Sequence, residues 1–120
     1  MTGLNLFQAD RVGDALVVAV HDGVGSFADA EILDAMQGVV AQLRKDGARC
    51  VVVDFEGVDY FGSSMLEALR LLWNELEQRD GRLALCNLSS VGREIVAISH
   101  FDQLWPIYGS RDEALHALQT

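Results

Sequence analysis

Apolar and polar residues follow two different periods along this chain, and each change of period marks a change of secondary structure. From Asp29 to Leu43 the apolar residues recur every three or four positions, which predicts a helix with one face on a core. The letters KDG that follow, ending in Gly47, are typical of a helix end. The run CVVVDF at 50–55 is apolar without alternation, which predicts a strand covered on both faces and a mixed or parallel sheet.

The remaining segments continue this succession of strands and helices. Two short strands are expected in FQADRVGDALVVAVHDGV, on either side of its GD turn. The later elements predicted in the same way are a helix over about 64–79, a strand in 81–88, a helix in 89–101 with Val91, Ile95 and Ile98 inward, a strand at 105–108, and a helix in 110–118 whose Ser110 and Glu113 have capping-box spacing. Residues 1–120 are thus expected to form one α/β domain with a central mixed sheet and about four helices.

The charge of the chain limits its partners. With a formal net charge of −9, the chain would repel the phosphates of nucleic acids and of anionic membrane surfaces. Its longest apolar runs fall well short of the roughly 20 residues that a membrane-spanning helix needs. The first ten residues contain neither a basic leader nor an apolar signal core. We therefore expect a cytoplasmic protein without direct membrane insertion, whose partners are proteins with neutral or basic faces.

The residues that most often bind metals or carry redox chemistry are scattered along the chain. Cys50 and Cys86 lie in separate strand-like runs and form no CxxC pair, so we expect buried, reduced thiols. The three histidines, His21, His100 and His116, show no metal-ligand spacing. The chain also contains no glycine-rich nucleotide-binding motif. The sequence therefore predicts no metal and no cofactor.

Two adjacent serines stand where the buried strand gives way to the helix over 64–79. Ser64 and Glu67 have the S-x-x-E spacing of a capping box, which would make Ser64 the cap of this helix. A cap explains neither Ser63 nor Gly62 in front of the pair, and a glycine there would allow a sharp turn or the close approach of another surface. The segment reads G-x-S-x-L, unlike the G-x-S-x-G of a nucleophile elbow, so no catalytic residue and no enzyme activity are predicted.

The predicted helix over 64–79 has an apolar side and a polar side. At about 100° per residue, the residues that gather on one side and form its expected core face are Met65, Leu69, Leu72 and Leu76. Leu71 falls on the other side, near Ser64 and among Glu67 and Glu75. An apolar residue among a serine and acidic residues on one exposed face is a candidate docking patch for another protein.

The segments VVVDFEGVDYFGSSMLEALRLL and GRLALCNLSSVGREIVAISHFDQLWPIYGSRDEAL resemble the STAS family, the anti-sigma factor antagonists. The most specific similarities are the strand ending in Asp54, the aromatic-rich approach to the paired serines, the strand GRLALCN and the closing FDQLWPIYGSRDEAL. The resemblance implies a STAS-type domain in which Ser64, or alternatively Ser63, is phosphorylated by a partner serine kinase that is also the anti-sigma factor. It also implies that a metal-dependent serine phosphatase reverses this, and that the unphosphorylated form binds the kinase and frees the sigma factor.

This resemblance directs the search for a partner-binding site to the serine pair and the helix behind it. The residues expected to contact the partner are Gly62, Ser63, Ser64, Met65, Glu67, Leu71 and Glu75. The family commonly has Asp before the two serines and Gly after them, where this chain has Gly62 and Met65, and His100 stands where a glycine is usual. These departures bear on recognition by the kinase and leave the expected fold unchanged.

A phosphate on Ser64 would add about −1.5 to −2 charges at the positive end of a helix, where free N–H groups tolerate it. We expect the phosphate to block binding through local repulsion and sterics, with little refolding. The alternative function is a STAS scaffold or adaptor that binds another protein constitutively in a signalling or transport complex, with the serines serving only as caps. The sequence also leaves open whether the chain forms a homodimer.

Overall fold

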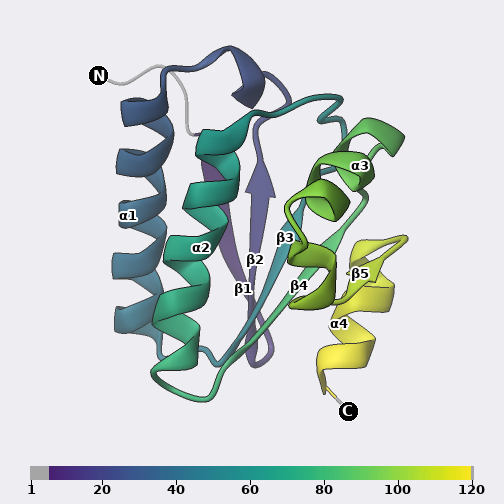
Figure 1. The fold of residues 1–120 in the computed structure, drawn as a ribbon. Coiled ribbons are helices and arrows are strands. Elements are labelled where there is room, and N and C mark those ends of the chain that lie inside the picture. The colour runs from purple at the N-terminus through teal and green to yellow at the C-terminus, as the bar shows by residue number, and fades with distance from the viewer. Residues whose placement is uncertain (1–5, 120) are drawn as a thin grey trace.

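The computed structural model describes residues 6–119 and shows a five-stranded sheet with helices packed on it (Figure 1). The strands are β1 (Phe7–Val12), β2 (Ala15–Val20), β3 (Cys50–Asp54), β4 (Arg82–Cys86) and β5 (Ile107–Tyr108). The helices are α1 (Asp29–Asp46), α2 (Ser63–Glu77), α3 (Ser90–Ile98) and α4 (Arg111–Gln119), with short 3-10 turns at Val24–Ser26 and Phe101–Gln103. The predicted α/β class is confirmed.

The sheet is mixed, as predicted, with the strand order β1-β2-β3-β4-β5. β1 and β2 form an antiparallel hairpin, and each later pair of neighbouring strands is parallel. Val52 in the middle of β3 lies opposite Val17 of β2 and Ala84 of β4. Because β3 and β4 run in the same direction, their carboxyl ends reach the same edge of the sheet, next to the start of α2 (Figure 1).

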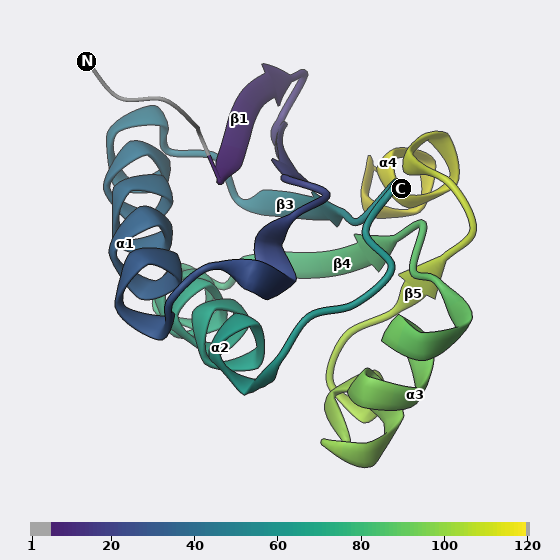
Figure 2. The ribbon, with the colours of Figure 1, turned by 90° about the horizontal axis from the view of Figure 1, so that it is seen from above.

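Alternate residues of the central strands face two different apolar clusters. Val51 and Val53 of β3 belong to the large core that also contains side chains of α1 and α2. Val52 belongs to a smaller cluster that contains Ala114 and Leu118 of α4. Figure 2 shows α4 on the opposite side of the sheet from α1 and α2. This double coverage explains why the run CVVVDF is apolar at consecutive positions.

Two helix ends form as the sequence predicts. At the end of α1, Gly47 has a φ of 72°, in the left-handed region, and its N–H donates to the Leu43 carbonyl at 2.9 Å. At the start of α4, the Ser110 hydroxyl accepts a hydrogen bond of 3.2 Å from the N–H of Glu113. Both predicted end signals are confirmed.

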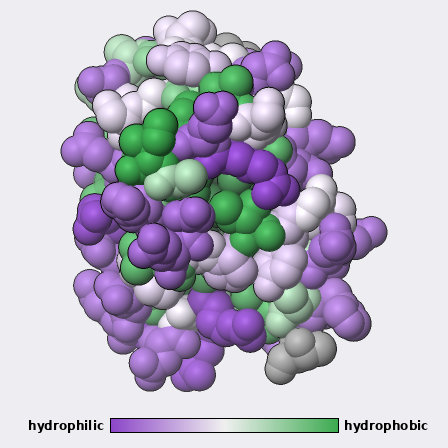
Figure 3. Space-filling model, turned by 45° about the vertical axis from the view of Figure 1, so that its right-hand side comes forward, coloured by the Kyte–Doolittle hydropathy of each residue, from purple (hydrophilic) through white to green (hydrophobic). Residues whose placement is uncertain are grey.

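The face that α3 turns inward differs from the predicted one. Val91 and Ile98 were expected to point inward but are 46% and 78% exposed, whereas Val96 is buried. A Cβ at Gly92 would lie 3.1 Å from a Leu88 side-chain carbon, so the glycine allows close packing on this side of α3. The prediction for Val91 and Ile98 is therefore wrong. On the side of the molecule that carries α3, apolar side chains appear as separate patches between hydrophilic ones (Figure 3).

Candidate functional site

The loop of residues 55–62 leads from the end of β3 to the start of α2 and is anchored by apolar side chains. Phe55, Val58 and Phe61 are buried, and the rings of Phe55 and Phe61 pack with their centroids 5.1 Å apart. The N–H of Phe55 also donates to the Cys86 carbonyl of β4 at 3.0 Å. Because this anchoring fixes the loop, α2 begins at a defined place beside the carboxyl ends of the strands.

Two neighbouring segments hold the outer side of this loop. The Ser89 hydroxyl, just before α3, donates to the Asp59 carbonyl at 3.0 Å. The turn at 23–26 lies so close to the loop that a Cβ on Gly25 would come within 2.8 Å of the Tyr60 carbonyl oxygen. The Tyr60 side chain is 58% exposed. The loop therefore presents an exposed aromatic ring shortly before the serine pair.

The two serines at the start of α2 occupy different environments. Ser63 is the first helical residue and is exposed, whereas Ser64 is 6% exposed. The Ser64 hydroxyl donates a hydrogen bond of 2.6 Å to Oδ1 of Asp29, the first residue of α1. The predicted capping box of Ser64 and Glu67 is wrong, because α2 begins one residue earlier and Ser64 turns toward a carboxylate of the neighbouring helix.

The first turn of α2 has no side-chain cap. Gly62 occupies the position before the helix, and its carbonyl accepts from the N–H of Met65 at 3.1 Å. Among the residues that the structure describes, no side chain accepts a hydrogen bond from the N–H of Ser63 or Ser64. Unpaired N–H groups at a helix start favour an anion, both through hydrogen bonds and through the helix dipole. The serine pair thus lies where a negative group is tolerated.

A buried carboxylate lies at the base of the same loop. Asp54, the last residue of β3, is 2% exposed. It accepts hydrogen bonds from Asn87 Nδ2 at 2.9 Å, from the N–H of Glu56 at 3.0 Å and from Arg111 Nε at 2.9 Å. Burial alone would raise the pKa of Asp54, but these hydrogen bonds and the charge of Arg111 outweigh it and lower the pKa below its usual value. This cluster joins β3, β4 and α4 where the loop begins.

Both cysteines are free thiols. Cys50 is half-buried and Cys86 is buried, so the burial predicted for both is complete only for Cys86. Burial, together with the nearby Asp54 carboxylate, raises the pKa of Cys86 to about 12. A thiol with such a pKa stays protonated at neutral pH and is a poor nucleophile. Cys86 is therefore part of the packing.

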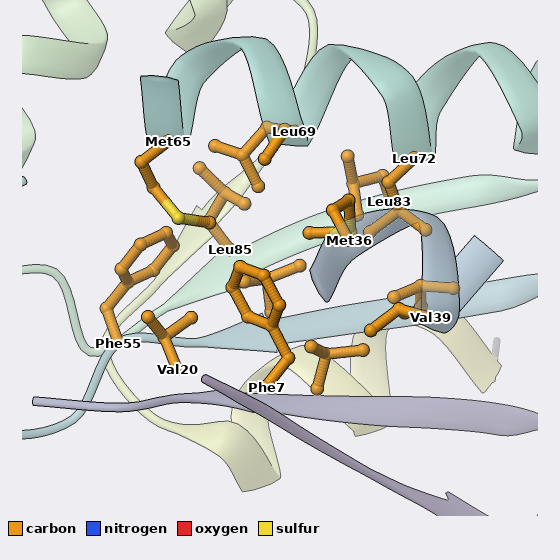
Figure 4. Packing of buried hydrophobic residues seen from close by; sticks show 14 of the residues in the cluster. Phe7, Val20, Met36, Val39, Phe55, Met65, Leu69, Leu72, Leu83 and Leu85 are labelled. Atoms are coloured by element: carbon orange, nitrogen blue, oxygen red, sulfur yellow. The ribbon is translucent and has the colours of Figure 1, made fainter. Parts of the chain in front are cut away.

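Met65 follows the serines but does not reach the surface. Its side chain is fully buried and points into the core toward Phe55 and Leu85 (Figure 4). The helical pattern predicted this core position correctly. Met65 can therefore influence a partner only through the position of α2, and its side chain does not offer a contact surface.

Glu75 is also buried, although the sequence pattern placed it on an exposed docking face. Its residue is 7% exposed, and its carboxylate binds Arg44 Nε at 2.9 Å and Arg79 Nη2 at 2.6 Å. Burial would raise the pKa of Glu75, but the two arginines outweigh it and lower the pKa. The predicted exposure is wrong because this side of α2 faces α1, which supplies Arg44.

Leu71 lies half-buried at the floor of a groove between α1 and α2. The groove has a volume of about 390 Å³ where Gln37, Arg44 and Asn74 line it with Leu71. It continues toward the start of α2 through a second hollow of about 290 Å³, which Glu67 also lines. Leu71 thus lines both hollows, and the exposed Glu67 lines the second one.

The described part of the chain shows neither a metal centre nor a membrane span. Within residues 6–119, no three His, Cys, Asp or Glu side chains come together in a way that could hold a metal ion. In the same range, no helix is both long enough and apolar enough to cross a bilayer.

Comparison with known proteins identifies the family. A model of the STAS domain matches residues 7–114 of the chain. The chain belongs to the STAS domain family. BtrV of Bordetella bronchiseptica, which is named as a candidate anti-sigma factor antagonist, is 37% identical to this STAS domain over 107 residues, or 89% of this chain and 90% of BtrV. The family predicted from the sequence is thereby confirmed.

Solved structures share the fold of this STAS domain. An anti-sigma factor antagonist (STAS) domain protein from Planctomyces limnophilus is 30% identical and superposes with a TM-score of 0.73, covering 95% of this chain and 98% of that one. The Bacillus cell fate determinant SpoIIAA, in its phosphorylated form, has a TM-score of 0.69 at 21% identity and covers 92% of this chain and 97% of its own. At that identity, the SpoIIAA comparison supports the fold alone.

The structure divides the predicted contact residues of this STAS domain into two groups. Those at least partly accessible are Gly62, Ser63, Glu67 and Leu71, and those buried are Ser64, Met65 and Glu75. Asp29 and the Asp54 cluster were missed by sequence reasoning. The position of Asp54 at the end of a predicted strand was a signal for a residue at the sheet edge, whereas nothing in the sequence joined Asp29 to Ser64.

Proposed function

We propose that this STAS domain is a regulatory protein of the anti-sigma factor antagonist type. It binds a partner that is both anti-sigma factor and serine kinase, and phosphorylation at the start of α2 switches this binding, with Ser64 as the acceptor and Ser63 as the alternative. A serine phosphatase reverses the modification. The proposal is supported by the similarity to BtrV and by the STAS fold, and it assigns the chain a regulatory role without enzyme activity of its own, in the cytoplasm.

One observation carries this proposal: a serine pair begins a helix whose first N–H groups have no side-chain acceptor within residues 6–119. A phosphate on either serine is compatible with the positive end of α2. In the Bacillus protein SpoIIAA, the same fold has been solved in a phosphorylated form. The fold is therefore compatible with a phosphate.

The docking surface that we propose consists of the accessible residues around the serine pair, namely Tyr60, Gly62, Ser63, Glu67 and Leu71. It combines an exposed aromatic ring, a half-buried leucine in a groove, and an acidic residue. A phosphate would make this surface more negative and bulkier. A partner that fits closely around the unmodified serine pair, with neutral or acidic groups facing it, would then lose affinity through repulsion and steric exclusion, which is the direction that an antagonist switched off by phosphorylation requires.

The test is intact-mass measurement and phosphopeptide mapping of the protein from the cells that produce it, with Ser64→Ala and Ser63→Ala as variants. One added phosphate on the serine pair, lost with the variant of the modified serine, is the expected result. Pull-down with the unmodified protein should then recover the kinase, and the phosphorylated protein should not. Absence of phosphate under several growth conditions would contradict the switch.

The second candidate is a constitutive scaffold or adaptor in a signalling or transport complex. It is favoured by the Ser64 hydroxyl, which is already engaged by Asp29 at 2.6 Å, and by Gly62, which lacks the carboxylate common in the family. For a scaffold, Ser64→Ala and Ser63→Ala would leave recovery of the partner unchanged. For a switch, the variant of the modified serine would bind the partner under conditions in which the wild-type protein is phosphorylated and released.

A further inference from the structure

The outer edge of the sheet is open along β1. This strand is the first in the order β1-β2-β3-β4-β5, so it pairs with β2 on one side only. The N–H of His21 donates to the Leu6 carbonyl at 2.8 Å, which places Leu6 and every second residue after it against β2. The residues between them, Phe7, Ala9 and Arg11, therefore direct their backbone N–H and C=O groups away from β2.

These outward groups have few partners within residues 6–119. The Gln42 side chain donates a long hydrogen bond of 3.5 Å to the Ala9 carbonyl, but no N–H of Phe7, Ala9 or Arg11 has an acceptor on this side in that range. The Arg11 guanidinium is held at the end of α1, where it donates to the Asp46 carbonyl at 3.0 Å. A row of unpaired backbone groups on an edge strand is a template for a further strand.

A hollow of about 470 Å³ lies between this edge and α1. Its apolar lining includes Phe7 and Ala9 of β1 and Val39 of α1. Gly38 leaves the helix side of the hollow open, since a Cβ there would have no atom within 4 Å. In Figure 2, β1 stands at one end of the sheet with α1 beside it. Because side chains alternate between the faces of a sheet, a strand added to β1 would direct every second side chain into this hollow.

The length of the hollow matches a short strand. Along α1 it is lined from Glu31 to Gln42, which at 1.5 Å per residue is about 16 Å of helix. A β-strand rises about 3.3 Å per residue, so about five residues of an extended chain fit along it. β1 itself has six residues. An added strand could thus follow most of β1 and fill the hollow at the same time.

The charge of the hollow favours a basic occupant. Glu31 and Asp34 are exposed and line it, and within residues 6–119 no Lys or Arg does. Asp10, whose side chain lies on the other face of β1, is exposed as well. A second copy of this chain would bring its own Glu31 and Asp34 and a further net charge of −9 to the same edge. A basic segment of a different protein is therefore the better electrostatic match.

We propose that β1 and this hollow form a docking edge for an extended segment of another protein. The segment is about five residues long, its apolar side chains alternate with polar ones, and a Lys or Arg in it faces Glu31 and Asp34. Backbone hydrogen bonds to Phe7, Ala9 and Arg11 provide affinity, and the hollow selects the side chains. The docking edge lies apart from the serine pair, so it does not rest on the proposed function and gives the domain a second binding site.

The test uses the full chain and two end-blocked synthetic peptides, Lys-Thr-Val-Thr-Val and the reverse sequence Val-Thr-Val-Thr-Lys, whose binding is followed by NMR. In both peptides the lysine and the two valines share one face of an extended chain. Binding should slow hydrogen exchange at the amides of Phe7, Ala9 and Arg11, which gain acceptors. Exchange at Gln8 and Asp10, which already pair with β2, should stay the same. The peptide that binds more tightly gives the direction of the added strand.

Two variants of the docking edge separate strand addition from loose association. Gly38→Leu fills the hollow and should weaken binding about tenfold or more, since a buried valine is lost. Gly38→Ala is the matched control: it also replaces the glycine in α1 but leaves most of the hollow empty, so it should bind like the wild-type protein. Ala9→Pro removes one outward N–H without touching the ladder to β2, and should weaken binding about tenfold.

The contribution of charge has its own pair of variants. Glu31→Gln combined with Asp34→Asn should weaken binding of the lysine peptides about threefold and make it less dependent on salt. Asp102→Asn combined with Asp112→Asn removes the same charge from exposed residues that do not line the hollow, and should change binding little.

The inference would be overturned if neither peptide bound, if Gly38→Leu bound them like the wild-type protein, or if exchange at Phe7, Ala9 and Arg11 stayed unchanged with peptide bound. Association of the chain with itself through these amides would also overturn it, because the occupant would then be a second copy. None of these measurements involves the serine pair. The proposed function is judged by phosphate mapping and partner recovery, so the failure of one does not imply the failure of the other.

Discussion

Arg111, the first residue of α4, donates from its Nε to the buried Asp54 carboxylate at 2.9 Å and so ties the last helix to the end of β3. The two residues differ in exposure, since the Arg111 side chain is 44% exposed and that of Asp54 is 2% exposed. If the pair is broken, the exposed arginine can bind water in place of Asp54, whereas the buried carboxylate cannot bind water in place of Arg111. The cost of breaking this pair therefore depends on which residue is removed.

Asp54→Ala should lower the free energy of unfolding by about 3 kcal/mol, because it leaves the donors of Asn87 and of the Glu56 N–H unsatisfied and opens a small void. Arg111→Ala should cost less, about 1 kcal/mol, since Asp54 keeps its two other donors. Urea denaturation at pH 7 measures both values. The double variant should be destabilised by less than the two single values together, and strict additivity would show that the pair is not coupled.

The carboxylates of Asp54 and Glu75 should make the protein less stable in acid. Both have folded-state pKa values below their usual values, so their contribution to stability is complete above about pH 5, where the unfolded chain is also ionised. It is lost as the pH falls through the lower folded-state pKa, because the unfolded chain then binds protons more readily.

Urea midpoints measured from pH 8 to pH 2 test this expectation. They should change little down to about pH 5 and fall below about pH 4. In the double variant Asp54→Asn and Glu75→Gln, the acid part of the curve should be less steep, although the stability at pH 7 is lower. If the urea midpoint of that variant fell just as steeply in acid, other carboxylates would be responsible for the loss of stability.

The secondary structure could be predicted from the sequence because each element has an apolar period that its packing requires. The run CVVVDF illustrates this: it is apolar throughout because Val51 and Val53 face one cluster and Val52 the other. Of the three α3 residues expected to point inward, Ile95 packs against the core, whereas Val91 and Ile98 are exposed. The pattern of apolar side chains did not show that Gly92 lets α3 pack closely on its own side.

The candidate site was predicted less well, because a helical period shows which residues share a face and not what covers that face. Glu75 lies on the polar side of α2 as predicted, yet that side packs beside Arg44 of α1. Ser64 likewise has the spacing of a cap, in which its oxygen would accept from a backbone N–H, but its hydroxyl instead donates to Asp29, 35 positions away. Polar contacts between elements distant in sequence decide both cases, and no local pattern records them.

Glu75 and Glu67 offer a direct comparison of a buried acid and an exposed acid on α2. Glu75→Gln should lower the free energy of unfolding by about 1 to 2 kcal/mol, because it weakens the hydrogen bonds to Arg44 and Arg79. Glu67→Gln should change stability by less than about 0.5 kcal/mol, as expected for an exposed site. Partner recovery by pull-down should respond in the opposite order, with a larger change for Glu67→Gln. If Glu75→Gln reduced partner binding more than Glu67→Gln did, at matched stability, Glu75 would have to be part of the docking surface after all.

The two departures from the family motif should respond differently when the common family residues are introduced. Gly62 has a φ of −103°, and a Cβ there would meet only the Tyr60 hydroxyl at 3.8 Å, so Gly62→Asp fits without strain. Its carboxylate can cap α2, and we expect a gain of about 0.3 kcal/mol in the free energy of unfolding. Met65→Gly should instead cost about 4 kcal/mol, because it empties a fully buried site and places glycine in a helix.

Urea denaturation of the two variants, with Met65→Ala as a control that keeps a good helix former, separates these effects. Met65→Ala should be about 1 kcal/mol more stable than Met65→Gly, because alanine has the higher helix propensity. The stability that Met65→Ala still loses relative to the wild-type protein is the cost of the cavity. If Met65→Gly were as stable as the wild-type protein, the core would not depend on Met65. If Gly62→Asp were destabilising, the start of α2 would differ from the structure, and with it the place of the serine pair.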